Sequence, residues 1–146
     1  MHLTDALELR FAEVSTLPES PGVYEIWAGS VPLKVGIAVN LRSRLMVHAV
    51  LSRQSGLRFK PDGPPFEPKD VRSTKSILAK HLYFDREIAR DLDLTTEAGR
   101  RSFLATRCFI RYRSTTTRAA ARAIEARLEA TDHYRYVRRL RDRQRQ

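Results

Sequence analysis

The feature that most constrains the fold is a pair of short apolar segments that are joined by a glycine turn and followed at once by a helix signal. Val23–Trp27 and Val31–Ile37 are rich in β-branched and aromatic residues, which favour strands. Ala28-Gly29-Ser30 lies between them and contains the glycine that hairpin loops favour. Asn40 then provides an N-cap for a helix with leucines along one side. The sequence therefore predicts a β-hairpin that leads directly into a helix.

Polar side chains of this segment are expected to converge on one small surface. Tyr24 lies on the first strand and Lys34 on the second, while Arg44 and His48 are four residues apart on the helix and share a face. A tyrosine among cationic groups at the meeting point of two strands and a helix is typical of an active site. Its composition indicates phosphodiester chemistry.

The same residues resemble the two motifs of the GIY-YIG nuclease family. Gly22-Val23-Tyr24 matches the first motif, and Lys34-Val35-Gly36 stands where the second motif usually has a tyrosine before a hydrophobic residue and glycine. Arg44 follows at the spacing that the family uses for its catalytic arginine. The resemblance covers about residues 21–48 and 107–130. It implies cleavage of DNA with a divalent metal, Mg²⁺ or Mn²⁺, held by a glutamate of a later helix.

A helix of this kind is predicted after Thr115-Thr116-Thr117, where alanine and leucine give high helix propensity. Glu125 falls on the apolar stripe of this helix, beside Ile124 and three residues before Leu128. A carboxylate there is costly unless it meets a cation, a metal or a hydrogen-bond donor. The resemblance implies that Glu125 is the metal ligand. Two alternatives stay open, a competing role for Glu129 and ion pairs between Glu125 and the helix arginines Arg118, Arg122 and Arg127.

Each motif residue has an expected role. Arg44 would clamp the scissile phosphate, because a guanidinium stays charged and offers paired donors. The resemblance implies that Tyr24 helps to deprotonate or orient the attacking water. Lys34 either contacts phosphate and favours the phenolate form of Tyr24, or marks a site that has lost hydrolysis and kept its binding surface. His48 would aid acid–base chemistry or contact phosphate.

The remaining sequence completes a single α/β domain over residues 1–146. We expect a first helix that begins at Thr4, a surface loop over residues 55–69 with four prolines, and two further helical segments from Ile77 to about Asp91 and from about Thr96. Residues 107–113 alternate as a third strand. The fold class is thus a small three-stranded antiparallel sheet flanked by helices, GIY-YIG-like, with an insertion at about 53–106 and a basic C-terminal helix or tail at about 133–146.

Charge indicates the partner. The chain of 146 residues carries a formal net charge of +10, which favours a polyanion, and we expect nucleic acid, DNA in particular. The tail after Asp132 adds six arginines against one aspartate. Its two tyrosines, Tyr134 and Tyr136, are candidates for base stacking or for cation–π contacts. The candidate nucleic-acid-binding residues are Arg42, Arg135, Arg138, Arg139 and Arg141.

Cysteine usage and hydropathy indicate the compartment. Cys108 is the single cysteine, so an intramolecular disulfide is excluded, and the sequence has no apolar run of membrane-spanning length. We expect a cytoplasmic protein without a membrane segment. Three functions stay open: a metal-dependent endonuclease, which is favoured, a catalytically degenerate module that only binds nucleic acid, and a protein-interaction module that docks its partner on the inserted helices.

Overall fold

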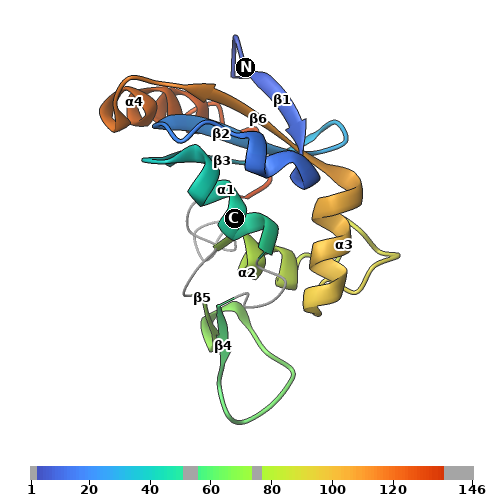
Figure 1. Ribbon diagram of the computed structural model, residues 1–146. Coiled ribbons are helices and arrows are strands. Elements are labelled where there is room, and N and C mark those ends of the chain that lie inside the picture. Colours follow the sequence, from blue (N-terminus) through green and yellow to red (C-terminus); the bar gives the residue numbers. More distant parts are fainter. Residues whose placement is uncertain (1–2, 51–55, 74–76, 137–146) are drawn as a thin grey trace.

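The computed structural model describes residues 3–50, 56–73 and 77–136, and it is a mixed α/β structure (Figure 1). The strands are β1 (Leu7–Arg10), β2 (Gly22–Ala28), β3 (Val31–Ala38), β4 (Leu57–Phe59), β5 (Val71–Ser73) and β6 (Cys108–Ser114). The helices are α1 (Leu41–Val50), α2 (Ile77–Phe84), α3 (Glu97–Arg107) and α4 (Arg118–Glu129), with short 3₁₀ helices η1 (Phe11–Thr16) and η2 (Pro68–Asp70). Within the described residues, no helix has the length and apolar character needed to cross a bilayer.

The main sheet is antiparallel and has the strand order β1-β6-β2-β3. The predicted hairpin is present as β2 and β3, with Gly29 of its turn at a φ of 58°. The predicted third strand is present as β6, which pairs with β2 on its other side. The three predicted strands are confirmed, and β1 extends the sheet by a fourth.

The prediction of an N-terminal helix from Thr4 was wrong. Leu7 to Arg10 form β1, whose residues pair with β6 in the register Leu7 to Tyr112 and Arg10 to Phe109. A helical period through this segment would bury Leu7, yet Leu7 is 64% exposed and Leu9 packs on the core instead. Pairing with a strand far along the chain therefore overrides the local pattern. The 3₁₀ helix η1 that follows buries Phe11 and Val14.

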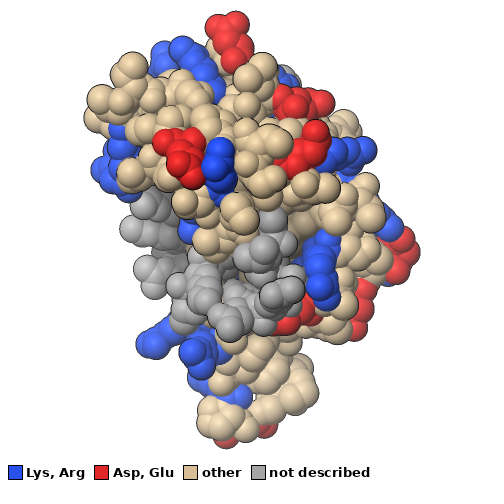
Figure 2. Space-filling view, in the orientation of Figure 1, with Lys and Arg blue, Asp and Glu red and all other residues tan. Residues whose placement is uncertain are grey.

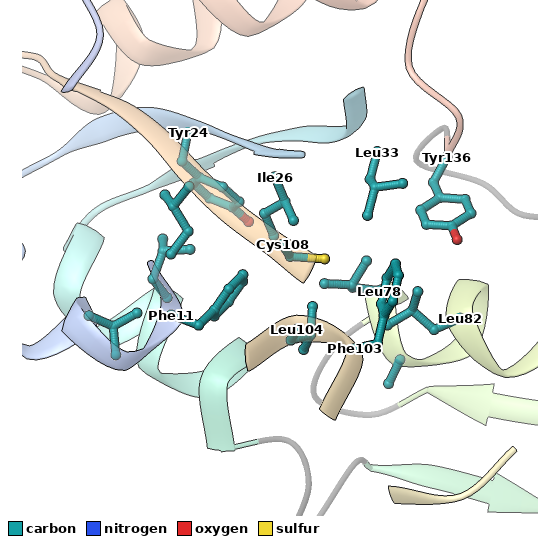
Figure 3. Packing of buried hydrophobic residues seen from close by; sticks show 14 of the residues in the cluster. Phe11, Tyr24, Ile26, Leu33, Leu78, Leu82, Phe103, Leu104, Cys108 and Tyr136 are labelled. Carbon is teal, nitrogen blue, oxygen red and sulfur yellow. The ribbon is translucent and has the colours of Figure 1, made fainter. Parts of the chain in front are cut away.

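The sheet separates two apolar clusters. Helix α4 covers one face, while α1, α2 and α3 lie on the other (Figure 1). The larger cluster joins sheet residues such as Tyr24, Ile26 and Cys108 to Leu78 of α2 and Leu104 of α3 (Figure 3). The α4 side has its own cluster, which consists of Leu3, Val23, Val35, Ala121, Leu128 and Tyr134. Both faces of the sheet are therefore fixed by packing.

Side-chain caps begin helices α1, α3 and α4, and the Asn40 cap of α1 was predicted from the sequence. The Asn40 side chain accepts a hydrogen bond from the Ser43 N–H at 3.0 Å at the start of α1. Thr96 caps α3 and Thr117 caps α4 in the same manner. Because these caps need only neighbouring residues, the sequence alone predicts them well.

The insertion between α1 and β6 contains more than helices. Within the segment expected to be a loop, Leu57–Phe59 pairs with Val71–Ser73 as a two-stranded ribbon. The first inserted helix, α2, ends at Phe84 rather than near Asp91. Asp85 ends it, because its side chain accepts hydrogen bonds from the backbone of the next turn, at Glu87 and Ile88.

Candidate functional site

A pocket of about 380 Å³ lies beside β3, the strand at one end of the main sheet. Strand β2 contributes Tyr24, β3 contributes Lys34 and Gly36, and α1 contributes Arg44. The wall formed by α4 and the segment after it consists of Arg118, Arg122, Glu125, Glu129, Asp132, Tyr134 and Tyr136. Val35 and Ile37 of β3, together with Ile77 and His81 of α2, complete the lining. The pocket thus lies where the motif hairpin meets the helix that carries Glu125.

Tyr24 lines this pocket from the centre of the sheet, and its ring is almost completely buried. Its hydroxyl lies 3.2 Å from Nε2 of His48, which is also buried. On the neighbouring strand Tyr24 pairs with Gly36, and a Cβ at that position would lie 2.5 Å from the Tyr24 hydroxyl oxygen. The motif glycine therefore leaves the space that the tyrosine hydroxyl occupies.

His48 is held in its neutral form. Burial lowers the pKa of His48 well below its usual value, and the nearby cations Lys34 and Arg44 lower it further. A neutral imidazole has one nitrogen that accepts a hydrogen bond. In the tautomer with Nε2 unprotonated, His48 accepts the hydrogen bond of the Tyr24 hydroxyl.

Helix α4 presents one row of charged residues to the pocket. Arg118, Arg122, Glu125 and Glu129 are spaced so that they follow one face of the helix, and all four line the pocket. Cations occupy the first half of the row and carboxylates the second half. From the sequence, Arg118 and Arg122 were considered only as ion-pair partners of Glu125. Their common helical spacing with Glu125 is the signal that identifies them as pocket residues.

The acidic part of the pocket offers carboxylate oxygens, which are the donors that Mg²⁺ prefers. Glu125, Glu129 and Asp132 line the same pocket, although within the described residues no three His, Cys, Asp or Glu side chains group closely enough to enclose a metal. Mg²⁺ commonly keeps several waters and is held by one or two carboxylates together with substrate phosphates. A closed structural site of the zinc type would need four protein ligands.

The segment that follows α4 forms part of the pocket wall and is held by a dense set of contacts. The backbone N–H groups of Arg135 and Tyr136 donate to the carbonyl oxygens of Pro32 and Leu33 on β3, at 2.9 and 2.7 Å. The side chains of Arg135 and Tyr136 both donate to Asp85 at the end of α2. This segment is irregular rather than helical, so the described part of the predicted basic tail does not continue α4.

The two tail tyrosines are buried. Tyr134 donates its hydroxyl hydrogen bond to Glu25, a fully buried carboxylate on β2, and Tyr136 packs on His81 with ring centroids 4.8 Å apart. Burial and the hydrogen bond to a carboxylate raise the pKa of both tyrosines above the usual value. Neither ring is exposed for stacking on bases, so that expectation was wrong.

Arg42 and Arg135, the two expected nucleic-acid-binding residues that the structure describes, do not line the pocket. Arg135 is ion-paired with Asp85, and Arg42 donates to the Leu17 carbonyl and to Glu19. Arg138, Arg139 and Arg141 lie outside the described residues. The structure brings together Tyr24, Lys34, Arg44 and Glu125 at one pocket, with His48 behind Tyr24.

Comparison with known proteins finds no matching family model. The chain is similar to the GIY-YIG N-terminal endonuclease domain of UvrC from Thermotoga maritima. A point mutant of that domain, bound to its catalytic divalent cation, matches 88% of this chain and 93% of its own, with 17% identity and a TM-score of 0.48. The magnesium-bound domain matches 86% of this chain and 92% of its own, with 17% identity and a TM-score of 0.47. These structures carry the family name that the two sequence motifs indicated.

Proposed function

We propose that the protein is a metal-dependent endonuclease that hydrolyses DNA phosphodiester bonds in the pocket beside β3. One observation carries this proposal: Tyr24, Lys34, Arg44 and Glu125, which come from four different elements, line the same pocket. Separate structural roles for the four residues would not require them to share one cavity.

The cations of the pocket have the chemistry to bind the scissile phosphate and its neighbour. Arg44 offers paired donors to the non-bridging oxygens, and Lys34 adds a point charge beside it. Arg118 and Arg122 of α4 line the same pocket, where they have the charge to hold an adjacent phosphate. Charge that develops on the phosphate oxygens in the transition state is then met by preorganised donors.

Tyr24 and His48 have the arrangement of a proton-accepting pair. As the water oxygen bonds to phosphorus and the bond to the departing 3′ oxygen breaks, the water gives a proton to the Tyr24 oxygen. Tyr24 passes its own proton to Nε2 of His48, which lies 3.2 Å away. Because burial lowers the pKa of His48, the ring starts in its neutral form, which is the form that can take up a proton.

Glu125 is the residue that would hold Mg²⁺ or Mn²⁺, with Glu129 or Asp132 in support. When bound, the metal neutralises charge on the phosphate and departing oxygens. Glu125 supplies the hard oxygen donor that such a cation prefers, and it lines the same pocket as Arg44.

The test is cleavage of supercoiled plasmid, branched DNA and single-stranded DNA with Mg²⁺ or Mn²⁺. Arg44→Ala and Glu125→Gln should each lower the rate by roughly 10²–10³-fold, as expected for loss of one group that stabilises transition-state charge. Arg127→Ala is the matched control, since Arg127 is exposed on α4 and does not line the pocket. Equal activity of all four proteins would overturn the assignment.

A second candidate is a module that binds nucleic acid without cutting it. Lys34, which occupies the place of the second motif tyrosine and lines the pocket, favours this function. If the native chain binds DNA and cuts no substrate, and Lys34→Tyr restores no cleavage, the binding function replaces the enzymatic one.

We also propose the cytoplasm as the compartment. Cys108 is buried, and burial raises the pKa of its thiol to about 12. A thiol of this kind is unreactive, so the single cysteine indicates neither a disulfide nor redox chemistry.

A further inference from the structure

The two-stranded ribbon of the insertion is a separate surface that the pocket does not use. Strands β4 and β5 pair antiparallel in the register Leu57 to Ser73, Arg58 to Arg72 and Phe59 to Val71. Figure 1 shows the ribbon at the end of the molecule farthest from the main sheet, beyond α2. Side chains alternate between the two faces of such a ribbon, so its faces differ in chemistry.

The apolar face fixes the ribbon to the body of the protein. Val71 is fully buried, while Phe59 is 43% exposed and its ring lies 4.9 Å from that of Phe66 and 5.2 Å from that of Tyr83 on α2. An isolated two-stranded ribbon is only marginally stable, and packing against a helix adds the stability that it needs. The ribbon is therefore held in place against α2.

The opposite face sets two arginines directly across from each other. Arg58 and Arg72 are cross-strand partners and both are exposed. Like charges at such positions repel, since the side chains of a directly opposed pair begin about 4.5–5.5 Å apart. Within the part of the chain that the structure describes, neither guanidinium forms an ion pair, whereas the neighbouring Lys60 is paired with Asp70 at 2.9 Å. The arrangement costs stability unless an anion lies between or above the two guanidinium groups.

Helix α2 lies between the ribbon and the pocket and contacts the ribbon through its apolar face. Ile77 and His81 of α2 line the pocket, while Tyr83 of the same helix contacts Phe59 on the ribbon. An eight-residue helix is about 12 Å long, so the two surfaces are separated by little more than one short helix. Figure 2 shows Lys and Arg side chains gathered over the ribbon at the lower end of the molecule.

We propose that Arg58 and Arg72 form a second contact for the nucleic-acid backbone, which holds the strand beyond the pocket without reading its sequence. This inference rests on the proposed function, because it assumes that nucleic acid occupies the pocket. A phosphate backbone fits the pair, since it offers closely spaced anions that relieve the repulsion between the two guanidinium groups. The net charge of +10 favours the same polyanion over an acidic protein.

The experiment is a salt titration of DNA binding by fluorescence anisotropy, with a short labelled duplex and EDTA to prevent cleavage. Arg58→Ala/Arg72→Ala should weaken binding by about tenfold and reduce the slope of log K against log salt by about 1.8, as two lost phosphate contacts require. Arg86→Ala/Arg101→Ala removes the same charge from exposed positions outside the ribbon. Its slope of log K against log salt should stay close to that of the native protein. Equal slopes for the two double variants would overturn the proposal and make general charge the explanation.

A second pair of variants separates binding from folding. Arg58→Lys/Arg72→Lys keeps both charges and should keep the native slope. Arg72→Glu should place an attractive pair across the ribbon, so its thermal midpoint should equal or exceed that of the native chain while its DNA affinity falls. A variant that loses both stability and affinity would indicate a structural role instead.

The outcomes also distinguish this inference from the proposed function. If native protein cuts DNA and the Arg58→Ala/Arg72→Ala variant binds and cuts as the native protein does, only the ribbon contact fails, and an acidic protein becomes the better occupant. If native protein neither binds nor cuts DNA at low salt, both proposals fail together.

Discussion

At the scale of single residues, the pocket depends on the close fit between Gly36 and Tyr24. A Cβ at Gly36 would lie 2.5 Å from the hydroxyl oxygen and 2.6 Å from Cζ of Tyr24. The tyrosine is enclosed by the core, so its ring has little room to retreat. The motif glycine and the motif tyrosine thus form one steric unit.

Gly36→Ala should therefore affect both folding and activity. We expect a loss of about 1–3 kcal/mol in unfolding free energy, as overpacking in a closed core commonly costs. Cleavage should fall because the Tyr24 hydroxyl is displaced from His48. Urea unfolding and the plasmid assay measure the two effects. Gly29→Ala is the control for activity: alanine is strained at the positive φ of Gly29, so stability should fall, but Gly29 does not line the pocket and cleavage should remain. If Gly36→Ala kept the stability and cleavage rate of the native protein, the close steric fit between Gly36 and Tyr24 would be contradicted.

His48 should give the protein a specific dependence of stability on pH. Its pKa is lowered in the folded state, so below about pH 6.5 the unfolded chain binds a proton that the folded chain resists. The stabilising contribution of neutral His48 is complete above pH 6.5 and is lost as the pH falls below it, by at most about 1.4 kcal/mol per pH unit.

His48→Gln should remove that slope. The measurement is the unfolding free energy of native and variant protein at several pH values between 6.5 and 5, from urea titrations. Asp85, whose pKa is about 2, does not change its charge in this range. Parallel curves of unfolding free energy against pH for the two proteins would show that His48 does not contribute to the pH dependence.

At the scale of elements, Asp85 links the end of α2 to the segment after α4. Burial opposes ionisation of Asp85, but hydrogen bonds from Arg135, Tyr136 and the backbone outweigh it and lower the pKa to about 2. The contribution of this carboxylate is therefore present above about pH 4 and is lost as the pH falls toward 2. One residue thus fixes a wall of the pocket.

Asp85→Asn should loosen that wall. We expect a cost of about 1–3 kcal/mol, because Arg135 and Tyr136 lose a charged acceptor in a half-buried site. Amide hydrogen exchange of Arg135 and Tyr136, which donate to β3, should become faster than in the native chain. Asp91→Asn is the matched control, because Asp91 pairs with Arg107 at the surface and should change little. Unchanged exchange in Asp85→Asn would contradict the link.

The elements that the sequence predicted are those whose signals are local. Asn40 and Thr117 cap helices through bonds to residues three positions away, and the hairpin needs only its own turn. Strand β1 was missed because its partner β6 lies at the other end of the chain.

At the site, too, residues in local motifs were predicted, whereas contacts between residues far apart in the sequence were not. The motifs predicted Tyr24, Lys34, Arg44 and Glu125, which the fold brings to one pocket. The bond between Arg135 and Asp85 joins residues 50 positions apart, and no local pattern indicates it.

At the scale of the whole molecule, one sheet is shared by two apolar clusters. Leu104 on α3 belongs to the larger cluster and Leu128 on α4 to the smaller one. Because β2 carries residues of both, loss of one cluster should weaken the other. A single cooperative transition is expected, as for most domains of this size.

Leu104→Ala and Leu128→Ala should each lower stability by about 2–5 kcal/mol and keep that single transition. Trp27 is the only tryptophan, and its fluorescence reports on β2, while circular dichroism reports on the helices. The two signals should change at the same urea concentration in each variant. Separate midpoints in Leu128→Ala would show that α4 unfolds independently of the rest.

The hydrogen bonds that Arg135 and Tyr136 donate to β3 also bear on self-association. A sheet ends in strands whose free N–H and C=O groups can template pairing with another molecule. The C-terminal segment covers the Pro32 and Leu33 carbonyls, so β3 is shielded over its first half and borders the pocket over its second. The other end of the sheet is β1, where Leu7 is exposed. Intermolecular strand pairing at high concentration would therefore begin at β1, away from the pocket.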